Sequence, residues 1–73
     1  MTPELKIGQF AKAVGVNIET IRYYERLNLL GPTSRLPSGY RLYDHEAQQR
    51  LQFIKNAQAL GFTLPEIEEL LDF

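Results

Sequence analysis

Two short helical patterns, separated by a break of about three residues, constrain the fold of this chain more than any other feature. The first pattern spaces apolar residues along one helix face, at Ile7, Phe10, Ala11 and Val14. Gly15 is suited to end that helix because glycine readily adopts a positive φ. Asn17 then caps a second helix that runs to about Asn28. The two helices form a helix-turn-helix, with Ile21 and either Tyr24 or Glu25 facing the first helix.

A small β-hairpin is expected after this pair of helices. Gly31 and Pro32 stop helical structure, and residues 33–39 are rich in turn-forming residues. The following segment, residues 40–43, has the composition of a strand. Residues from about 33 to 43 therefore predict a hairpin, or wing.

The rest of the chain predicts two more helices. Asp44 is a good N-cap for a third helix. Its apolar stripe comprises Ala47, Leu51, Ile54 and Ala57, and we expect Phe53 and Leu60 to widen it. Gly61 is suited to end that helix, with Phe62 packing behind it. Residues 63–66 form a capping box that starts a fourth helix, whose apolar residues are Leu64, Ile67, Leu70 and Leu71.

These elements predict a mainly α fold, a winged helix-turn-helix of four helices with a small β-hairpin wing. A chain of 73 residues is long enough for one small domain, here residues 1–73. We place the helix-turn-helix at about 7–26, the hairpin wing at about 33–43 and a helix pair at about 44–72.

Two clusters of arginine and tyrosine, in residues 20–26 and 39–43, carry the chemistry of the chain. Arginine offers a planar fork to phosphate or guanine, and tyrosine offers a flat face with a hydroxyl at its tip. The net charge of −1 hides an uneven distribution. Residues 6–43 hold six bases and two acids, whereas residues 44–73 hold two bases and six acids. Such a split hints at an anion-binding face, although small domains also show it by chance.

The second helix supplies the first group of candidate DNA contacts. Its N-terminal end is the part that a recognition helix points at base edges, and the residues there are Asn17, Thr20 and Tyr23. Arg22 and Arg26 are four residues apart and share a face, so both can reach phosphates of one strand. The alternative is a solvated charged face on which these arginines pair with Glu19 or Glu25.

The hairpin and the third helix supply the remaining candidates. Arg35 and Arg41 flank the turn of the wing and can lie along the minor groove or the adjacent backbone. Tyr40 and Tyr43 join them as candidates, although at least one of these tyrosines is expected to hold the hairpin together. Lys55, with Gln58, lies off the apolar stripe of the third helix and can form a second, helical wing on phosphates.

Other classes of site lack the residues that they need. The chain has no cysteine, no glycine-rich phosphate loop and no HExxH pattern. His45 stands alone, and the carboxylates Glu66, Glu68 and Glu69 are typical of a solvated helix face. We therefore expect no enzymatic activity, no cofactor and no metal in this chain. No apolar run approaches a membrane span, and residues 1–4 lack the charged-then-apolar pattern of a signal peptide, so we expect a cytoplasmic protein without a membrane partner.

The order of the motifs resembles the DNA-binding domain of the MerR family of bacterial transcription regulators. The matching elements run from Lys6 to Leu71. They are residues 7–12 (IGQFAK), 15–16 (GV), 20–25 (TIRYYE), 29–30 (LL), 38–43 (SGYRLY), 60–64 (LGFTL) and 66–67 (EI). The stretch at 57–62 (AQALGF) is more similar to the metal-responsive branch of the family than to the drug-responsive one.

The resemblance implies a role for each matching position. Thr20, Arg22, Tyr23 and Arg26 would lie on the recognition helix, and Arg35, Tyr40, Arg41 and Tyr43 in the first wing. Lys55 and Gln58 would lie near a second wing formed by the last helix pair. Family members are homodimers joined by a long helix that follows the fourth helix. They bind a palindrome in double-stranded promoter DNA and distort its over-long spacer so that RNA polymerase can engage both promoter elements. An effector, often a metal ion, sets the switch.

The chain departs from this pattern because it ends where the dimer helix should begin and has no cysteine. Dimerisation and effector regions are thus absent from these residues, and the chain is either an excised domain or a naturally short relative. Two other functions remain open. One is a small winged-helix excision or architectural factor that binds DNA. The other is a protein-interaction module without a DNA role, which would use Leu70, Leu71 and Phe73 as a sticky patch.

Overall fold

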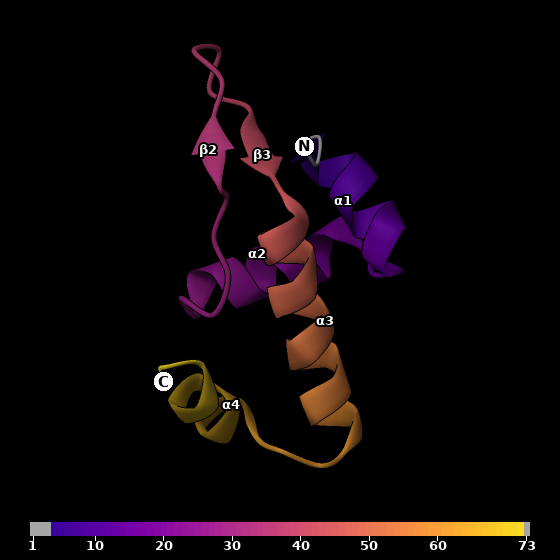
Figure 1. Ribbon diagram of the computed structural model, residues 1–73, viewed down its shortest axis with the longest axis vertical. Coiled ribbons are helices and arrows are strands. Elements are labelled where there is room, and N and C mark those ends of the chain that lie inside the picture. The colour runs from indigo at the N-terminus through magenta and orange to yellow at the C-terminus, as the bar shows by residue number, and fades with distance from the viewer. Residues whose placement is uncertain (1–3, 73) are drawn as a thin grey trace.

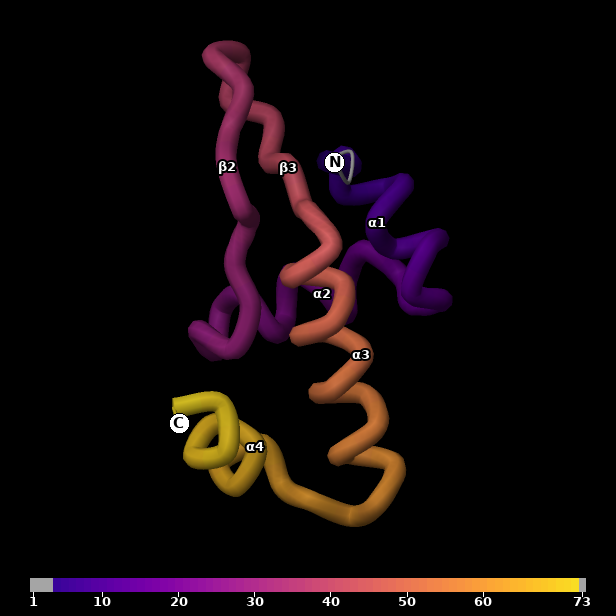
Figure 2. The backbone as a smooth tube through the Cα atoms, viewed as in Figure 1, coloured from indigo at the N-terminus to yellow at the C-terminus, as the bar shows by residue number. Residues whose placement is uncertain are grey.

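The computed structural model describes residues 4–72 and contains four helices and a small sheet (Figure 1). In chain order, the elements are β1 (Leu5–Lys6), α1 (Ile7–Val14), α2 (Ile18–Arg26), β2 (Ser34–Arg35), β3 (Arg41–Tyr43), α3 (His45–Ala59) and α4 (Leu64–Leu71). In the view of the backbone trace, the wing lies at the top, α2 passes behind the first turns of α3, and α4 folds back at the bottom (Figure 2). The predicted four helices and hairpin wing are confirmed.

The helix-turn-helix forms where the sequence predicts it. Gly15 ends α1 with φ of 81°, and its N–H donates to the carbonyl of Ala11 at 2.9 Å. Asn17 caps α2, because its Oδ1 accepts from the backbone N–H of Thr20 at 2.9 Å. The second helix ends at Arg26 rather than at about Asn28, because Asn28 adopts a left-handed conformation with φ of 60°.

The sheet has one strand more than the sequence predicts. Its order is β1-β3-β2 and all pairs are antiparallel, so β3 is the central strand. Leu5 lies opposite Tyr43, and Arg35 lies opposite Arg41. The residues just before α1 are therefore attached to the wing, which fixes the wing against the helix-turn-helix.

Side-chain caps start both C-terminal helices. Asp44 accepts from the N–H of Ala47 at 3.1 Å, and hydrogen bonds to its oxygens hold the pKa of this carboxyl below its usual value. Thr63 and Glu66 form the predicted capping box, which likewise lowers the pKa of Glu66. Both helices thus begin where the sequence predicts.

A single hydrophobic core joins all four helices to β3. Its buried members are Phe10, Ala11, Ile21, Tyr24, Leu29, Leu30, Tyr43, Ala47, Leu51, Ile54, Ala57 and Ile67. The predicted stripe of α3 and the assignment of Tyr24 to the core are confirmed. Because α3 packs against both α1 and the sheet, it holds the helix-turn-helix and the wing in one orientation.

Several apolar side chains lie outside this core. The prediction that Phe53 and Leu60 widen the buried stripe of α3 is wrong, because both are exposed, Leu60 by 79%. Phe62 is also exposed, although its N–H donates to the carbonyl of Ala57 as expected behind a helix end. In the predicted sticky patch Leu70 is exposed and Leu71 packs against the core, while Phe73 lies outside the described residues.

Candidate nucleic-acid interface

An open groove lies between α2 and the wing, with a volume of about 1020 Å³; we call it the α2–wing groove. Its lining residues are Lys6, Ile7, Gly8, Gln9, Arg22, Glu25, Arg26, Arg35, Gly39, Tyr40 and Arg41. Five of these side chains are basic and one is acidic. The fold thus gathers both arginine clusters, which are separate in sequence, around one cationic surface suited to a polyanion.

The N-terminal end of α2 is exposed and internally ordered. The hydroxyl of Thr20 donates to Oδ1 of Asn17 at 2.9 Å, the same oxygen that accepts the capping bond. The amide nitrogen of Asn17 has no hydrogen-bond partner among residues 4–72. A donor held on a capped helix end is well placed to read a base edge.

The two tyrosines of α2 face different environments. Tyr23 is exposed, and the guanidinium of Arg26 lies 6.0 Å from the centre of its ring. Tyr24 is buried and donates to the side chain of Gln58, and burial together with the neighbouring Tyr23 raises its pKa. Tyr23 is therefore available to a ligand, whereas Tyr24 holds α2 against α3.

The two tyrosines of the wing also separate, and one prediction is corrected. Tyr43 cannot contact DNA because its side chain is 0% exposed and its ring stacks on Phe10, with centroids 4.3 Å apart. Its hydroxyl donates to Oε2 of Glu25 at 3.1 Å, and burial and that negative charge raise the pKa of Tyr43 to about 12. Tyr40 is 60% exposed, with the ammonium of Lys6 4.8 Å from its ring centre. One wing tyrosine is structural, as the sequence led us to expect.

Ion pairing leaves most of the predicted arginines free. Within residues 4–72, a salt bridge joins Arg41 to Glu25, with Nη1 and Oε1 2.6 Å apart. The alternative in which Arg22 and Arg26 pair with Glu19 or Glu25 is not observed in this part of the chain. Both arginines are exposed, so their charges face solvent.

Lys55 has a structural partner that the sequence did not predict. Its Nζ donates to the carbonyl of Val14 at 3.1 Å, at the C-terminal end of α1, where a cation is electrostatically favoured. Lys55 is partly buried, so it ties α3 to the turn of the helix-turn-helix. Its contact with phosphate stays a prediction.

Sequence reasoning missed Lys6 and Gln9 as groove residues. Gln9 accepts from the backbone N–H of Lys6 at 3.1 Å, and this local bond starts α1 beside the groove. The strand that holds Lys6 has two residues, which is too short to show an alternating pattern. The only sequence signal for Lys6 as a groove residue was its position just before an apolar helix.

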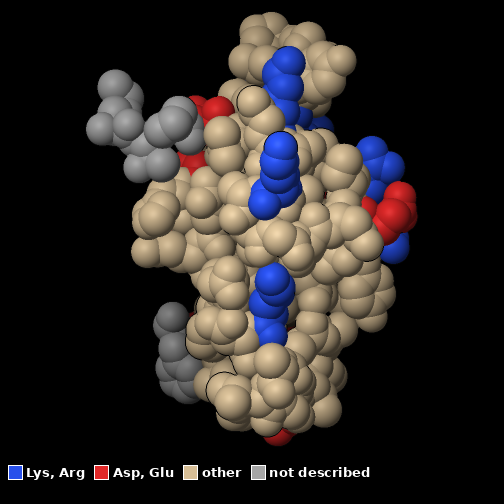
Figure 3. Space-filling view, turned by 90° about the vertical axis from the view of Figure 1, so that its right-hand side faces the viewer, with Lys and Arg blue, Asp and Glu red and all other residues tan. Residues whose placement is uncertain are grey.

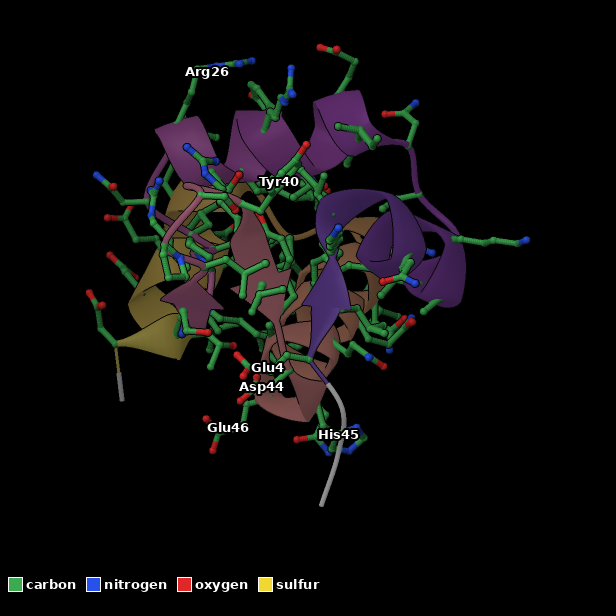
Figure 4. The ribbon with its side chains drawn as sticks, turned by 90° about the horizontal axis from the view of Figure 1, so that it is seen from above. Glu4, Arg26, Tyr40, Asp44, His45 and Glu46 are labelled. Atoms are coloured by element: carbon green, nitrogen blue, oxygen red, sulfur yellow. The ribbon has the colours of Figure 1, made fainter. Side chains whose placement is uncertain are left out.

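Part of the charge is sorted by sign on the surface, although Glu19 and Glu25 lie on α2 among its arginines. On the face shown in Figure 3, Lys and Arg side chains form a row along the long axis, with acids confined to its edges. Viewed from above, Arg26 lies at the α2 edge, whereas Glu4, Asp44 and Glu46 gather at the opposite edge (Figure 4). Across residues 4–72, no group of three or more His, Cys, Asp and Glu side chains is arranged to hold a metal.

Comparison with known proteins gives the chain a family. The family described as "MerR HTH family regulatory protein" matches residues 5–73. The chain belongs to the MerR family. This MerR-family chain is 53% identical over 68 residues to the mercuric resistance operon regulatory protein of Bacillus cereus, covering 93% of this chain and 52% of that protein. It is 46% identical over 66 residues to the HTH-type transcriptional regulator ZntR of Escherichia coli (strain K12), covering 90% and 47%. The chain spans about half the length of the curated relatives it matches.

Solved structures of MerR-family regulators share this fold. A MerR-family transcriptional regulator from Bacillus cereus aligns with a TM-score of 0.92 at 34% identity, over 97% of this chain and 53% of that one. HiNmlR, a MerR-family regulator that lacks the sensor domain and is bound to promoter DNA, aligns with a TM-score of 0.89. It covers 96% of this chain and 53% of its own, and at 21% identity it supports the fold alone. No helix in the described part of the chain has the length and apolar character needed to cross a membrane.

Proposed function

We propose that this chain is the operator-binding domain of a MerR-type transcription regulator and binds double-stranded DNA in a sequence-specific manner. The observation that carries the proposal is the α2–wing groove, where five basic side chains from β1, α2 and the wing surround one open surface. The relatives named as operon regulators support a role in transcription.

The geometry supports separate sets of residues for base readout and for phosphate binding. Asn17, Thr20 and Tyr23, at the exposed start of α2, would read base edges in the major groove. Arg22 and Arg26 would bind phosphates beside them, and Arg35, Tyr40 and Arg41 would bind the backbone or minor groove next to the wing. Phosphate contacts would thus fix the register in which the helix reads sequence.

In the complete regulator we propose a homodimer on a palindromic operator within a promoter. The two wings would deform the spacer so that RNA polymerase engages both promoter elements, and an effector would bias that deformation. A single domain binds one half-site and lacks the effective concentration that a linked dimer supplies. The isolated chain should therefore bind DNA weakly.

A salt titration with arginine variants tests this function. The wild-type chain is titrated against a duplex selected from a random-sequence library. The logarithm of its binding constant should fall linearly with the logarithm of salt concentration, with a slope of about 0.9 for each phosphate neutralised. Arg22→Ala and Arg35→Ala should each lower that slope by about one, because both side chains are exposed and line the groove. Arg22→Lys and Arg35→Lys keep the charge and should keep the slope. Wild-type affinity that does not respond to salt contradicts the proposed phosphate contacts.

A further inference from the structure

Glu25 is the one acidic side chain among the described residues that line the α2–wing groove. It lies on α2, and its side chain is only 10% exposed. Both carboxylate oxygens accept from β3: Oε1 from Nη1 of Arg41 at 2.6 Å, and Oε2 from the hydroxyl of Tyr43 at 3.1 Å. One residue of the helix is thus bonded to two residues of the wing.

A carboxylate in this position opposes binding of a polyanion. It cancels part of the positive charge of Arg41 and repels phosphates that approach the groove. Stability alone does not require it, since a well-packed apolar side chain often stabilises a partly buried site equally well. Its presence calls for a benefit other than affinity or stability.

The geometry of β3 suggests such a benefit for Glu25. Arg41 and Tyr43 are two residues apart on β3, so their side chains emerge on the same face of the strand. A single carboxylate therefore fixes that strand at two points. Tyr43 also stacks on Phe10 of α1, so a continuous series of side-chain contacts connects the recognition helix, the wing and the first helix.

The same bond also orients the arginine. A guanidinium has five N–H donors, and the bond to Glu25 engages one of its terminal nitrogens. The Arg41 side chain remains 39% exposed at the edge of the groove. Its remaining donors are therefore held in a defined direction in which a phosphate can meet them.

We propose that Glu25 is a positioning residue that sets the spacing between the recognition helix and the wing, and that it raises sequence discrimination at the expense of non-specific affinity. The inference rests on the proposed DNA-binding function and deepens it. A wing held at a fixed spacing accepts only duplexes whose local shape and deformability fit, whereas a loose wing adapts to any duplex.

The test compares two variants on two DNA probes. Glu25→Gln keeps the size of the side chain but removes its charge, and Tyr43→Phe removes only the hydroxyl that binds Glu25. The probes are a duplex that the wild-type chain enriches from a random-sequence library and a duplex of the same composition in scrambled order. Affinities are measured by fluorescence anisotropy at low salt, and circular dichroism establishes which variants are folded.

The expected results differ between the variants. Glu25→Gln should bind the scrambled duplex about threefold more tightly, since the groove gains one unit of positive charge. Its ratio of selected to scrambled affinity should fall about tenfold, which corresponds to about 1.4 kcal/mol. Tyr43→Phe should lower the ratio without changing affinity for the scrambled duplex. Glu68→Gln makes the same charge change at an exposed position on α4, outside the groove, and should alter neither quantity.

Two outcomes would overturn the inference. One is a ratio within twofold of wild type in folded Glu25→Gln. The other is a parallel loss of affinity for both duplexes, which indicates a merely structural role. Should Glu25→Gln fail to fold, an unchanged ratio in Tyr43→Phe decides against the inference. A wild-type chain that enriches no duplex refutes the proposed function itself, a result distinct from an unchanged ratio.

Discussion

Adding one methyl group at Gly15 and at Gly8 should change the stability of the fold in opposite directions. Gly15 ends α1 with φ of 81°, a conformation that costs an L-residue about 1–2 kcal/mol. A Cβ there would meet only Nζ of Lys55, at 3.9 Å, so no clash adds to that cost. Gly8 lies in the first turn of α1, and a Cβ there meets nothing within 4 Å. Alanine at Gly8 should stabilise the fold by about 0.5–1 kcal/mol.

The two variants should therefore differ in free energy of unfolding by about 2 kcal/mol. For a chain of this size, the midpoint of thermal unfolding should shift by about 4–8 °C for each kcal/mol. Urea denaturation followed by circular dichroism measures the difference, provided that all variants share one m-value. Gly15→Asn is the control, because asparagine tolerates the left-handed region better than alanine and should recover part of the loss. Equal stability of the two alanine variants would refute the argument from backbone conformation.

Three further predictions concern the core and pH dependence. Ile54→Ala, at a fully buried position of α3, should lower the free energy of unfolding by about 2–5 kcal/mol in urea denaturation, and a loss below 1 kcal/mol would contradict the packing. Because the pKa of Tyr43 is raised to about 12, the stability that it supplies is complete below about pH 10 and disappears as pH rises toward 12. Tyr43→Phe should therefore make the free energy of unfolding depend less on pH over that range. The pKa values of Asp44 and Glu66 are lowered, so their stabilisation is present above about pH 4 and is lost as pH falls below it. Asp44→Asn, which keeps a cap, should reduce the acid sensitivity of thermal unfolding.

Local signals predicted the helices well. Gly15, Asn17, Asp44 and Thr63 mark helix ends through their own backbone or side-chain chemistry, which depends on few neighbours. The same reasoning placed the end of α2 two residues late, because it made Asn28 the last helical residue although asparagine also tolerates the positive φ that it adopts here.

Features that depend on contacts between distant residues could not be read in this way. Periodicity gave no means of separating Phe53, which is exposed on α3, from its buried neighbours. Composition alone left Tyr40 and Tyr43 equivalent, and only the stack on Phe10 decides between them. The bond between Glu25 and Arg41 joins residues 16 positions apart on different elements, and no sequence pattern encodes that separation.

The pairing of β1 with β3 has a consequence for the order in which the domain folds during synthesis. Leu5 and Tyr43 are partners although 38 positions separate them, so β1 must wait for β3 to leave the ribosome before it can pair. The first two helices can form earlier, because their contacts are local. In a nascent chain the recognition helix would thus form before the wing is attached, and the core that contains Phe10 and Ile21 is complete only when α3 has also been made. We expect the DNA-binding surface to become competent late, once most of the domain has been synthesised.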